Sequence, residues 1–371
     1  MINDKELPPK IIRLACFIQG KQVPSSRFRI LGYIKHLESR GITCTIFPPL
    51  FCGKYGWVPS FARGPLHIVF KRISQICCYF PLRLFQILSA DLSKFDVVLI
   101  QKSLMDWPNS RILEKLIKSK NRNIIFDIDD AEFANIENVN FFSDKYVMEI
   151  SSISRVVIAG NEFLKGHFKK KCKEVVVLPT TVDENRFSPK NRQEEVTSCV
   201  GWTGTSSNFR YLFKLTPVFE KLAKNTNVKF LIISNKNYIQ ELAHIPNMTF
   251  TKWNVNHEVE QLHNIDIGVM PLENDLWTRG KCAFKLVQYQ SIGIPSVVSP
   301  VGANKEIQKE GVTGYFAQNN SEWLEKLTEL VENQKLRETV GFNARENFLS
   351  TLSIGSNVRE IAKIIHKLLA K

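Results

Sequence analysis

The sequence lacks the features that mark several common protein classes. It has no run of about 18 uninterrupted apolar residues, which a membrane-spanning helix would need, and its opening MINDKELPPK has no apolar signal-peptide core. Its eight cysteines include no C-x-x-C pair and lie mostly among apolar neighbours, which disfavours a structural zinc site or a disulfide framework. We therefore expect a cytoplasmic protein whose cysteines are reduced.

Nucleotide fingerprints and acidic residues are also scarce. Neither G-x-G-x-x-G nor a P-loop follows the first apolar run, so a dinucleotide-dependent oxidoreductase is disfavoured. Against 50 Lys and Arg stand 36 Asp and Glu, a net charge of +14, which favours a nucleic acid, an anionic membrane or a phosphorylated substrate as partner. Without an RNA-binding aromatic signature, a zinc finger or a helix-turn-helix pattern, we expect no nucleic acid.

The positive charge is concentrated in residues 54–95, which carry six Lys or Arg and one acid, Asp91. Apolar residues alternate with these bases between positions 66 and 88, and Pro81 is expected to divide the segment into two helices. Two interpretations stay open. An apolar face with a cationic rim suits a helix lying on anionic lipid, whereas a helical pair could equally cover the sheet of a first domain.

Apolar runs alternate with helical patterns along the whole chain. Runs such as 11–18, 95–101, 123–126 and 155–159 suit strands buried in a parallel sheet, and 27–40 has the period of a helix. The same rhythm restarts after the polar run 189–195, which we expect to link two domains. The pattern predicts an α/β protein with an N-terminal domain at 1–188, a C-terminal domain at 189–350 and a last helix at 351–371.

The most informative stretch is 278–300, TRGKCAFKLVQYQSIGIPSVVSP. Arg279, Gly280 and Lys281 form a basic loop ahead of a predicted helix at 282–292, which Gly293 ends before a short buried strand. Backbone N–H groups at such a helix start suit a phosphate. A second loop of small residues, also placed just before a helix, forms a similar anion cradle; it comprises Gly201, Trp202, Thr203, Gly204 and Thr205.

Three carboxylates, Asp127, Asp129 and Asp130, follow the predicted strand 123–126, at the end of a strand where α/β proteins bind ligands. A D-x-D metal motif, carboxylates whose mutual repulsion suits proton transfer, and residues that merely cap the next turn all stay open. After the first strand, Arg27 and Arg29 could pair with an anionic group or lie in solvent.

The stretch 278–300 resembles the nucleotide-sugar site of family 4 GT-B glycosyltransferases. Its G-x-P and Ser-Pro-Val-Gly elements match the family pattern, and Lys285, Gln288 and Tyr289 fill the Lys-x-x-Glu-Tyr positions. Gln288 thus replaces the ribose-binding Glu, and Gly280 replaces the first Glu of the longer pattern. Three further segments also resemble family elements: the SSRFR loop, the GNxxL element and the GWTG turn, which begin at Ser25, Gly160 and Gly201.

The resemblance implies two Rossmann-like domains that face each other across a cleft, with the last helix crossing back to the first domain. It implies Asp129, Asp130 and Lys285 as catalytic residues. The implied donor-binding residues are Gly201, Trp202, Thr203, Gly204, Thr205, Trp253, Arg279, Gly280, Lys281, Lys285 and Gln288. The implied acceptor-binding residues are Ser25, Ser26, Arg27, Arg29 and Asn161. For Trp253, stacking on the nucleotide base and core packing both stay open.

The implied activity is transfer of a sugar from a nucleotide-diphosphate sugar to an acceptor hydroxyl, with retention of configuration, no cofactor and no required metal. The acceptor would be a surface glycan or a lipid-linked sugar, and the enzyme would be cytoplasmic or bound to the inner face of the membrane. Two alternatives stay open: a nucleotide-sugar epimerase or hydrolase of the same fold, and a non-catalytic scaffold in a polysaccharide-assembly complex.

Overall fold

The computed structural model describes residues 11–370 except 51–63, 106–110, 135–143 and 190–196. The chain forms two compact units. The first comprises Met1–Pro179 together with Asn357–Lys371, and the second comprises Thr180–Ser356. The division therefore falls ahead of the expected boundary at 188, and each unit is described by itself.

The first unit is built on a parallel six-stranded sheet in the order β2-β1-β3-β4-β5-β6. Its apolar runs become strands because both faces of the sheet are covered. The strands are β1 (Ile12–Phe17), β2 (Ile42–Phe47), β3 (Val97–Gln101), β4 (Ile124–Ile128), β5 (Val156–Ala159) and β6 (Val175–Val177). The helices between them are α1 (Pro24–Arg29), α2 (Ile34–Glu38), α3 (Pro65–Ser74), α4 (Phe80–Ser89), α5 (Ile112–Lys120), α6 (Asp144–Ile153) and α7 (Glu162–Phe168).

The single helix predicted at 27–40 is wrong in both extent and continuity. α1 already begins at Pro24, whose fixed φ suits the first helical turn. It ends at Arg29, because the next residue, Ile30, leaves the helical region with a φ of −122° and a ψ of −61°. A 3₁₀ turn over Leu31–Tyr33 then precedes α2. Ser25 and Ser26 therefore lie inside a helix rather than in a loop.

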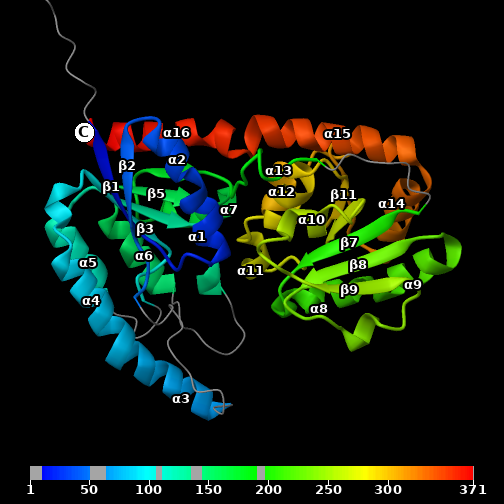
Figure 1. The fold of residues 1–371 in the computed structure, drawn as a ribbon, viewed down its shortest axis with the longest axis horizontal. Helices are drawn as coiled ribbons and strands as arrows, with labels where there is room; N and C mark the ends of the chain where they lie inside the picture. The colour runs from blue at the N-terminus through cyan, green and yellow to red at the C-terminus, as the bar shows by residue number, and fades with distance from the viewer. Residues whose placement is uncertain (1–10, 51–63, 106–110, 135–143, 190–196, 371) are drawn as a thin grey trace, which may run out of the picture. The chain divides into compact units, whose positions relative to one another are not determined.

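Two helices meet next to Pro81, as expected, but the helical chain is not interrupted between them. α3 and α4 are joined by a π-helical turn over Gln75–Tyr79, and Pro81 is the second residue of α4. Proline at a helix start loses no intrahelical hydrogen bond, and the wider turn just before it accommodates the ring. Figure 1 shows the two helices as one continuous arm that leaves the body of the first unit.

The second unit has its own parallel six-stranded sheet, in the order β12-β11-β10-β7-β8-β9. Its strands are β7 (Cys199–Gly204), β8 (Lys229–Ser234), β9 (Met248–Lys252), β10 (Ile267–Met270), β11 (Ser296–Val298) and β12 (Tyr315–Phe316). Its helices are α8 (Phe209–Leu212), α9 (Thr216–Asn225), α10 (Glu258–Leu262), α11 (Leu276–Arg279), α12 (Phe284–Ser291), α13 (Ala303–Ile307), α14 (Asn320–Glu332) and α15 (Gln334–Thr351). Side chains of β7, β8, α9 and α14 share one core that includes the buried Trp202.

The last helix, α16 (Ile354–Leu369), returns the chain to the first unit, as expected. Ile361 lines a small cavity of the first unit together with Leu14 and Leu99, and Lys367 Nζ lies 2.6 Å from Glu174 Oε1. Within the described part of the chain, no helix has both the length and the apolar character needed to cross a membrane.

Candidate functional site

The carboxyl ends of β1 and β3 carry a buried polar network. Gln19 Nε2 donates to the backbone oxygen of Gln101 at 2.8 Å, and Ser26 Oγ donates to Gln101 Oε1 at 2.6 Å. The backbone N–H of Gln19 donates to Ser26 Oγ at 3.2 Å. Ser26 is thus held between two strand ends, and the sequence pattern gave no sign of Gln19 or Gln101 because they are far apart along the chain.

Arg29 and Asp127 form a buried ion pair across the same edge. Arg29 Nη2 lies 2.6 Å and Nε 2.9–3.0 Å from the Asp127 carboxylate oxygens, while Nη1 donates to the backbone oxygen of Leu178. Burial raises the pKa of Asp127 and the guanidinium lowers it; burial disfavours charged Arg29, but Asp127 outweighs this and raises the pKa of Arg29. The bidentate geometry favours the ionised pair.

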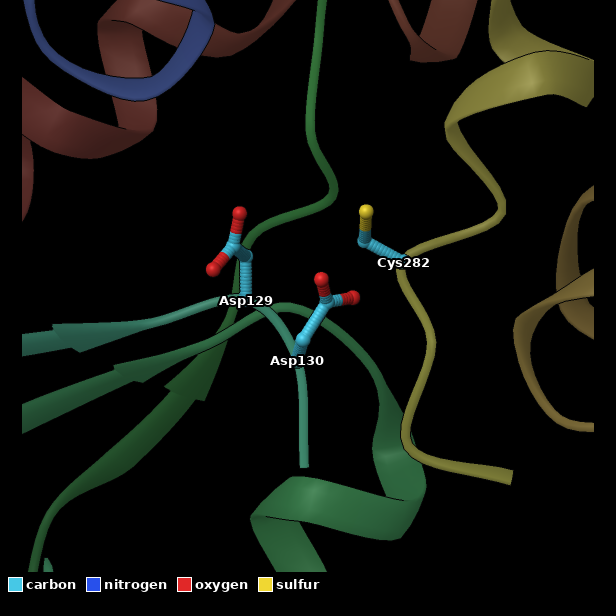
Figure 2. A group of neighbouring side chains, drawn as sticks. All are labelled: Asp129, Asp130 and Cys282. Atoms are coloured by element: carbon cyan, nitrogen blue, oxygen red, sulfur yellow. The ribbon is translucent and has the colours of Figure 1, made fainter. Parts of the chain in front are cut away.

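Asp129 and Asp130 follow β4 directly, as Figure 2 shows. Asp129 is buried, and its Oδ1 lies 3.0 Å from Lys102 Nζ. Lys102 has a left-handed φ of 56°, rare for a residue with a side chain, and its N–H donates to the backbone oxygen of Asp127 at 2.7 Å. Asp130 is half-buried. Sequence reasoning missed Lys102, which follows β3 without a recognisable motif.

Gly160 determines where Asp129 can lie, because a Cβ at this glycine would come within 2.6 Å of the Asp129 backbone oxygen and 2.8 Å of its Cα. We expect Gly160→Ala to displace Asp129 and to cost about 1–3 kcal/mol of stability, as overpacking does. Thermal unfolding measures the loss. Gly166→Ala is the matched control, since no atom lies within 4 Å of its Cβ position, and it should be neutral or stabilising. Equal melting temperatures for both variants would contradict this.

The remaining residues expected to bind the acceptor make contacts within the first unit. Asn161 is fully buried, and its Oδ1 accepts the N–H of Leu164 at 2.9 Å, so it caps α7. The Arg27 guanidinium lies 4.8 Å from the Phe28 ring centroid. Ser25 is buried in α1. Acceptor binding by these residues stays a prediction.

In the second unit, the predicted anion cradle is the end of β7 and the turn after it. Trp202 is buried, and Lys285 Nζ lies 5.2 Å from its ring centroid. A Cβ at Gly204 would approach Lys285 Cε to 2.8 Å and Trp202 Cη2 to 2.7 Å, so glycine lets Lys285 lie along the strand end. Thr205 Oγ1 pairs with Ser207 Oγ at 2.8 Å.

The basic loop of Arg279, Gly280 and Lys281 reaches the same turn. Lys281 Nζ donates to Asn208 Oδ1 at 3.1 Å and lies 4.7 Å from the Trp277 ring centroid. Arg279 is exposed, and its Nε donates to Asn274 at 2.7 Å. The structure thus brings Lys281 and Lys285 to the strand end that carries the small residues.

α12 begins later than predicted, at Phe284, because Ala283 has a left-handed φ of 52°. Tyr289 lies under the turn, and its hydroxyl accepts the N–H of Thr203 at 3.3 Å. Gly201 is also packed closely, since a Cβ there would overlap Ile265. Burial raises the pKa of Tyr289, so its hydroxyl stays protonated and can donate. Lys285 thus projects from the first turn of a helix anchored to β7.

Gln288 has a carboxylate beside it that the sequence pattern did not reveal. Its Nε2 lies 3.4 Å from Glu258 Oε1, and both side chains are buried. Glu258 Oε2 in turn lies 3.0 Å from Arg186 Nη2. Half-buried Trp253 follows β9, and its backbone N–H donates to the backbone oxygen of Ser234 at 2.7 Å. Position 288 carries an amide where the family pattern has a carboxylate, and the carboxylate of Glu258 on α10 lies next to that amide.

The comparisons with known proteins agree with this arrangement. Residues 196–333 match the family model for glycosyl transferases group 1. HepE from Anabaena, solved with UDP and glucose, is 14% identical, with 96% of this chain and 100% of that chain covered at a TM-score of 0.65. Sucrose-phosphate synthase from Thermosynechococcus elongatus is 12% identical, with 97% and 99% covered at a TM-score of 0.68. None of the curated protein sequences matches significantly.

Two parallel sheets with flanking helices, matched over nearly the whole chain by these structures, define a protein of the GT-B glycosyltransferase fold. The second unit carries the group 1 domain. The GT-B fold expected from the sequence is confirmed, and the match of residues 196–333 to the group 1 model agrees with the resemblance found in the sequence.

Proposed function

We propose that the protein transfers a sugar from a nucleotide-diphosphate sugar to an acceptor hydroxyl with retention of configuration. The observation that carries the donor class is the convergence of Lys281 and Lys285 on the turn after β7, where one cation contacts Asn208 and the other lies over Trp202. This site suits a diphosphate. HepE, a structural neighbour, binds UDP and UDP-glucose, and retention rests on the resemblance to family 4 enzymes.

In the proposed reaction, the bond between the anomeric carbon and the diphosphate oxygen breaks, and a bond from that carbon to the acceptor oxygen forms. The leaving diphosphate gains negative charge, which Lys285 and Lys281 stabilise, with Arg279 beside them. The acceptor hydroxyl passes its proton to a carboxylate, and we assign Asp129 or Asp130 to this role at the reacting end of the acceptor side. Gln288, Glu258 and Trp253 form the nucleoside end of the donor site.

We propose that this reaction requires no metal ion. The D-x-D alternative needs Asp127 and Asp129 to ligate a cation with free carboxylate oxygens. In the first unit each of these carboxylates instead faces a cationic side chain, Arg29 at 2.6 Å and Lys102 at 3.0 Å. These two cationic side chains already balance the negative charge of both carboxylates.

We propose a surface glycan or a lipid-linked sugar as acceptor and the cytoplasm, or the inner face of its membrane, as the place of reaction. The net charge of +14 supports an anionic acceptor or surface. A role in polysaccharide assembly is consistent with both acceptor classes.

Calorimetry with UDP and GDP, followed by turnover of the matching nucleotide sugars, tests the proposal. We expect micromolar to millimolar binding of one nucleotide, which would also protect the protein thermally, slow donor hydrolysis without acceptor, and transfer that survives EDTA. Binding of neither nucleotide would favour the scaffold, and rapid epimerisation or hydrolysis without acceptor would favour the alternative enzyme. Loss of activity in EDTA with rescue by a divalent cation would overturn metal independence.

A further inference from the structure

The outer face of α3 is apolar. Its exposed large hydrophobic side chains continue through the π turn onto α4; they are Leu66, Ile68, Val69, Ile73, Ile76, Phe85 and Leu88. Leu66, Val69, Ile73 and Ile76 recur at three- and four-residue intervals, which places them along one side of a helix. We call these four residues the α3 stripe. An apolar row of this kind on a described surface marks an interaction site rather than scattered exposed residues.

In α3 the usual burial pattern is reversed, since polar residues face the first unit and apolar residues face outward. Ser74 and Gln75, at the end of α3 and the start of the π turn, are buried, whereas the stripe faces out. A helix whose role is to cover a sheet has the opposite pattern. The alternative in which residues 66–88 only cover the sheet of the first domain therefore does not account for α3.

α4, in contrast, is anchored to the first unit. The buried guanidinium of Arg83 donates to the backbone oxygens of Phe47 at 3.0 Å and Ile18 at 3.1 Å, and Gln86 Nε2 donates to that of Pro48. α4 also packs against α5. Arg83 thus belongs to this anchor and not to the basic rim, and α3 extends from a fixed base (Figure 1).

The charge next to the stripe is of one sign. Pro65–Ser74 and Phe80–Ser89, with the turn between them, contain no Asp or Glu. Arg72, which is exposed, borders the stripe, whereas Lys71 is half-buried on the other side of α3. Two copies of this face placed together would bring two Arg72 side chains close to each other, with no acid from α3 or α4 to balance them. A lipid surface, which is apolar inside and anionic outside, fits the stripe and the neighbouring Arg72.

We propose that the α3 stripe inserts into the interface of an anionic lipid bilayer, with Arg72 at the phosphate level. The membrane then holds the first unit through α3, while Arg83 and Gln86 carry the attachment to the sheet. This surface is separate from the nucleotide site, and its lipid binding does not depend on transferase activity.

Co-sedimentation of the full chain with vesicles tests the proposal. At low salt the protein should pellet with vesicles of phosphatidylglycerol and phosphatidylcholine in equal amounts, and not with phosphatidylcholine alone. Val69→Gln with Ile73→Gln should weaken binding at least about tenfold. Arg72→Gln should weaken it about fivefold, from about 1 kcal/mol for this base.

The matched control is Phe342→Gln with Lys335→Gln, which removes an exposed apolar and a basic side chain from α15, and it should bind as wild type does. The exposed thiols of Cys77 and Cys78 give a second readout, because a polarity-sensitive dye attached there should shift to the blue on anionic vesicles and Cys77→Ser with Cys78→Ser should abolish the shift. No pelleting by wild type, equal pelleting with both vesicle types, or a lipid-free dimer that Val69→Gln with Ile73→Gln dissociates would overturn the proposal.

Discussion

Lys285→Ala is expected to lower the turnover number by roughly 10³-fold, because a charge aimed at the leaving diphosphate is worth most in the transition state. Lys285 lies on the first turn of α12, 5.2 Å from the Trp202 ring centroid, and the missing Cβ of Gly204 gives its stem room. Initial-rate kinetics with the donor identified by calorimetry measures the effect. The turnover number should fall more than the Michaelis constant for the donor rises.

Three variants define the outcome for Lys285. Lys285→Arg keeps the charge and should recover part of the rate, although its planar fork cannot occupy the same position. Lys335→Ala removes a lysine from the exposed face of α15 and should leave the rate unchanged. If Lys285→Ala changes only donor affinity, the residue binds the ground state and the transition-state role is wrong.

Arg29→Leu should destabilise the first unit by about 3–5 kcal/mol, because it leaves Asp127 buried without its partner. Both side chains are almost fully buried, and three hydrogen bonds join them. Hydrogen exchange read by mass spectrometry resolves the two units. We expect faster exchange in peptides from β1 and β4 and little change in peptides from β7 and β8.

Arg27→Leu is the control for Arg29→Leu, since Arg27 is the neighbouring arginine of α1 and is only half-buried. Replacing both Arg29 and Asp127 by Leu should recover much of the loss, because no unpaired charge stays in the core. Wild-type exchange in Arg29→Leu, or equal acceleration in both units, would show that the pair does not support the first unit.

The defect of Arg29→Leu should also depend on pH. Burial raises the pKa of Asp127, and without Arg29 nothing in the pair opposes this rise. The folded-state pKa then lies above the unfolded value of about 3.9. At pH values below the unfolded pKa, Asp127 is protonated in both states and its neutral form contributes fully to stability. This contribution is lost as the pH rises through the folded-state pKa of Asp127. The loss of stability in Arg29→Leu should therefore be smallest in acid.

The alternation of apolar runs with helical periods was enough to predict two parallel α/β sheets, because a strand buried on both faces leaves a continuous apolar signature. It was not enough to find the break at Ile30, where the apolar period runs on unchanged while the backbone leaves the helical region. The π turn at Gln75–Tyr79 was equally hidden, since a single wider turn changes the register without changing the composition.

The two sites differ in how much the sequence revealed. The loop of Lys281 and the helix of Lys285 are contiguous, so a local pattern identifies them. The pair of Arg29 with Asp127 joins positions 98 residues apart, and Glu258 meets Gln288 only through the packing of α10 near α12. Such contacts depend on which strands and helices become neighbours, and no local pattern carries that information.

The first unit is made of two separate pieces of chain, with the second unit encoded between them. Ile361, Ile365 and Leu368 of α16 are buried, and they leave the ribosome only after the whole second unit has been synthesised. The second unit can therefore finish folding during translation, whereas the sheet of the first unit must wait, partly uncovered, until the final helix arrives.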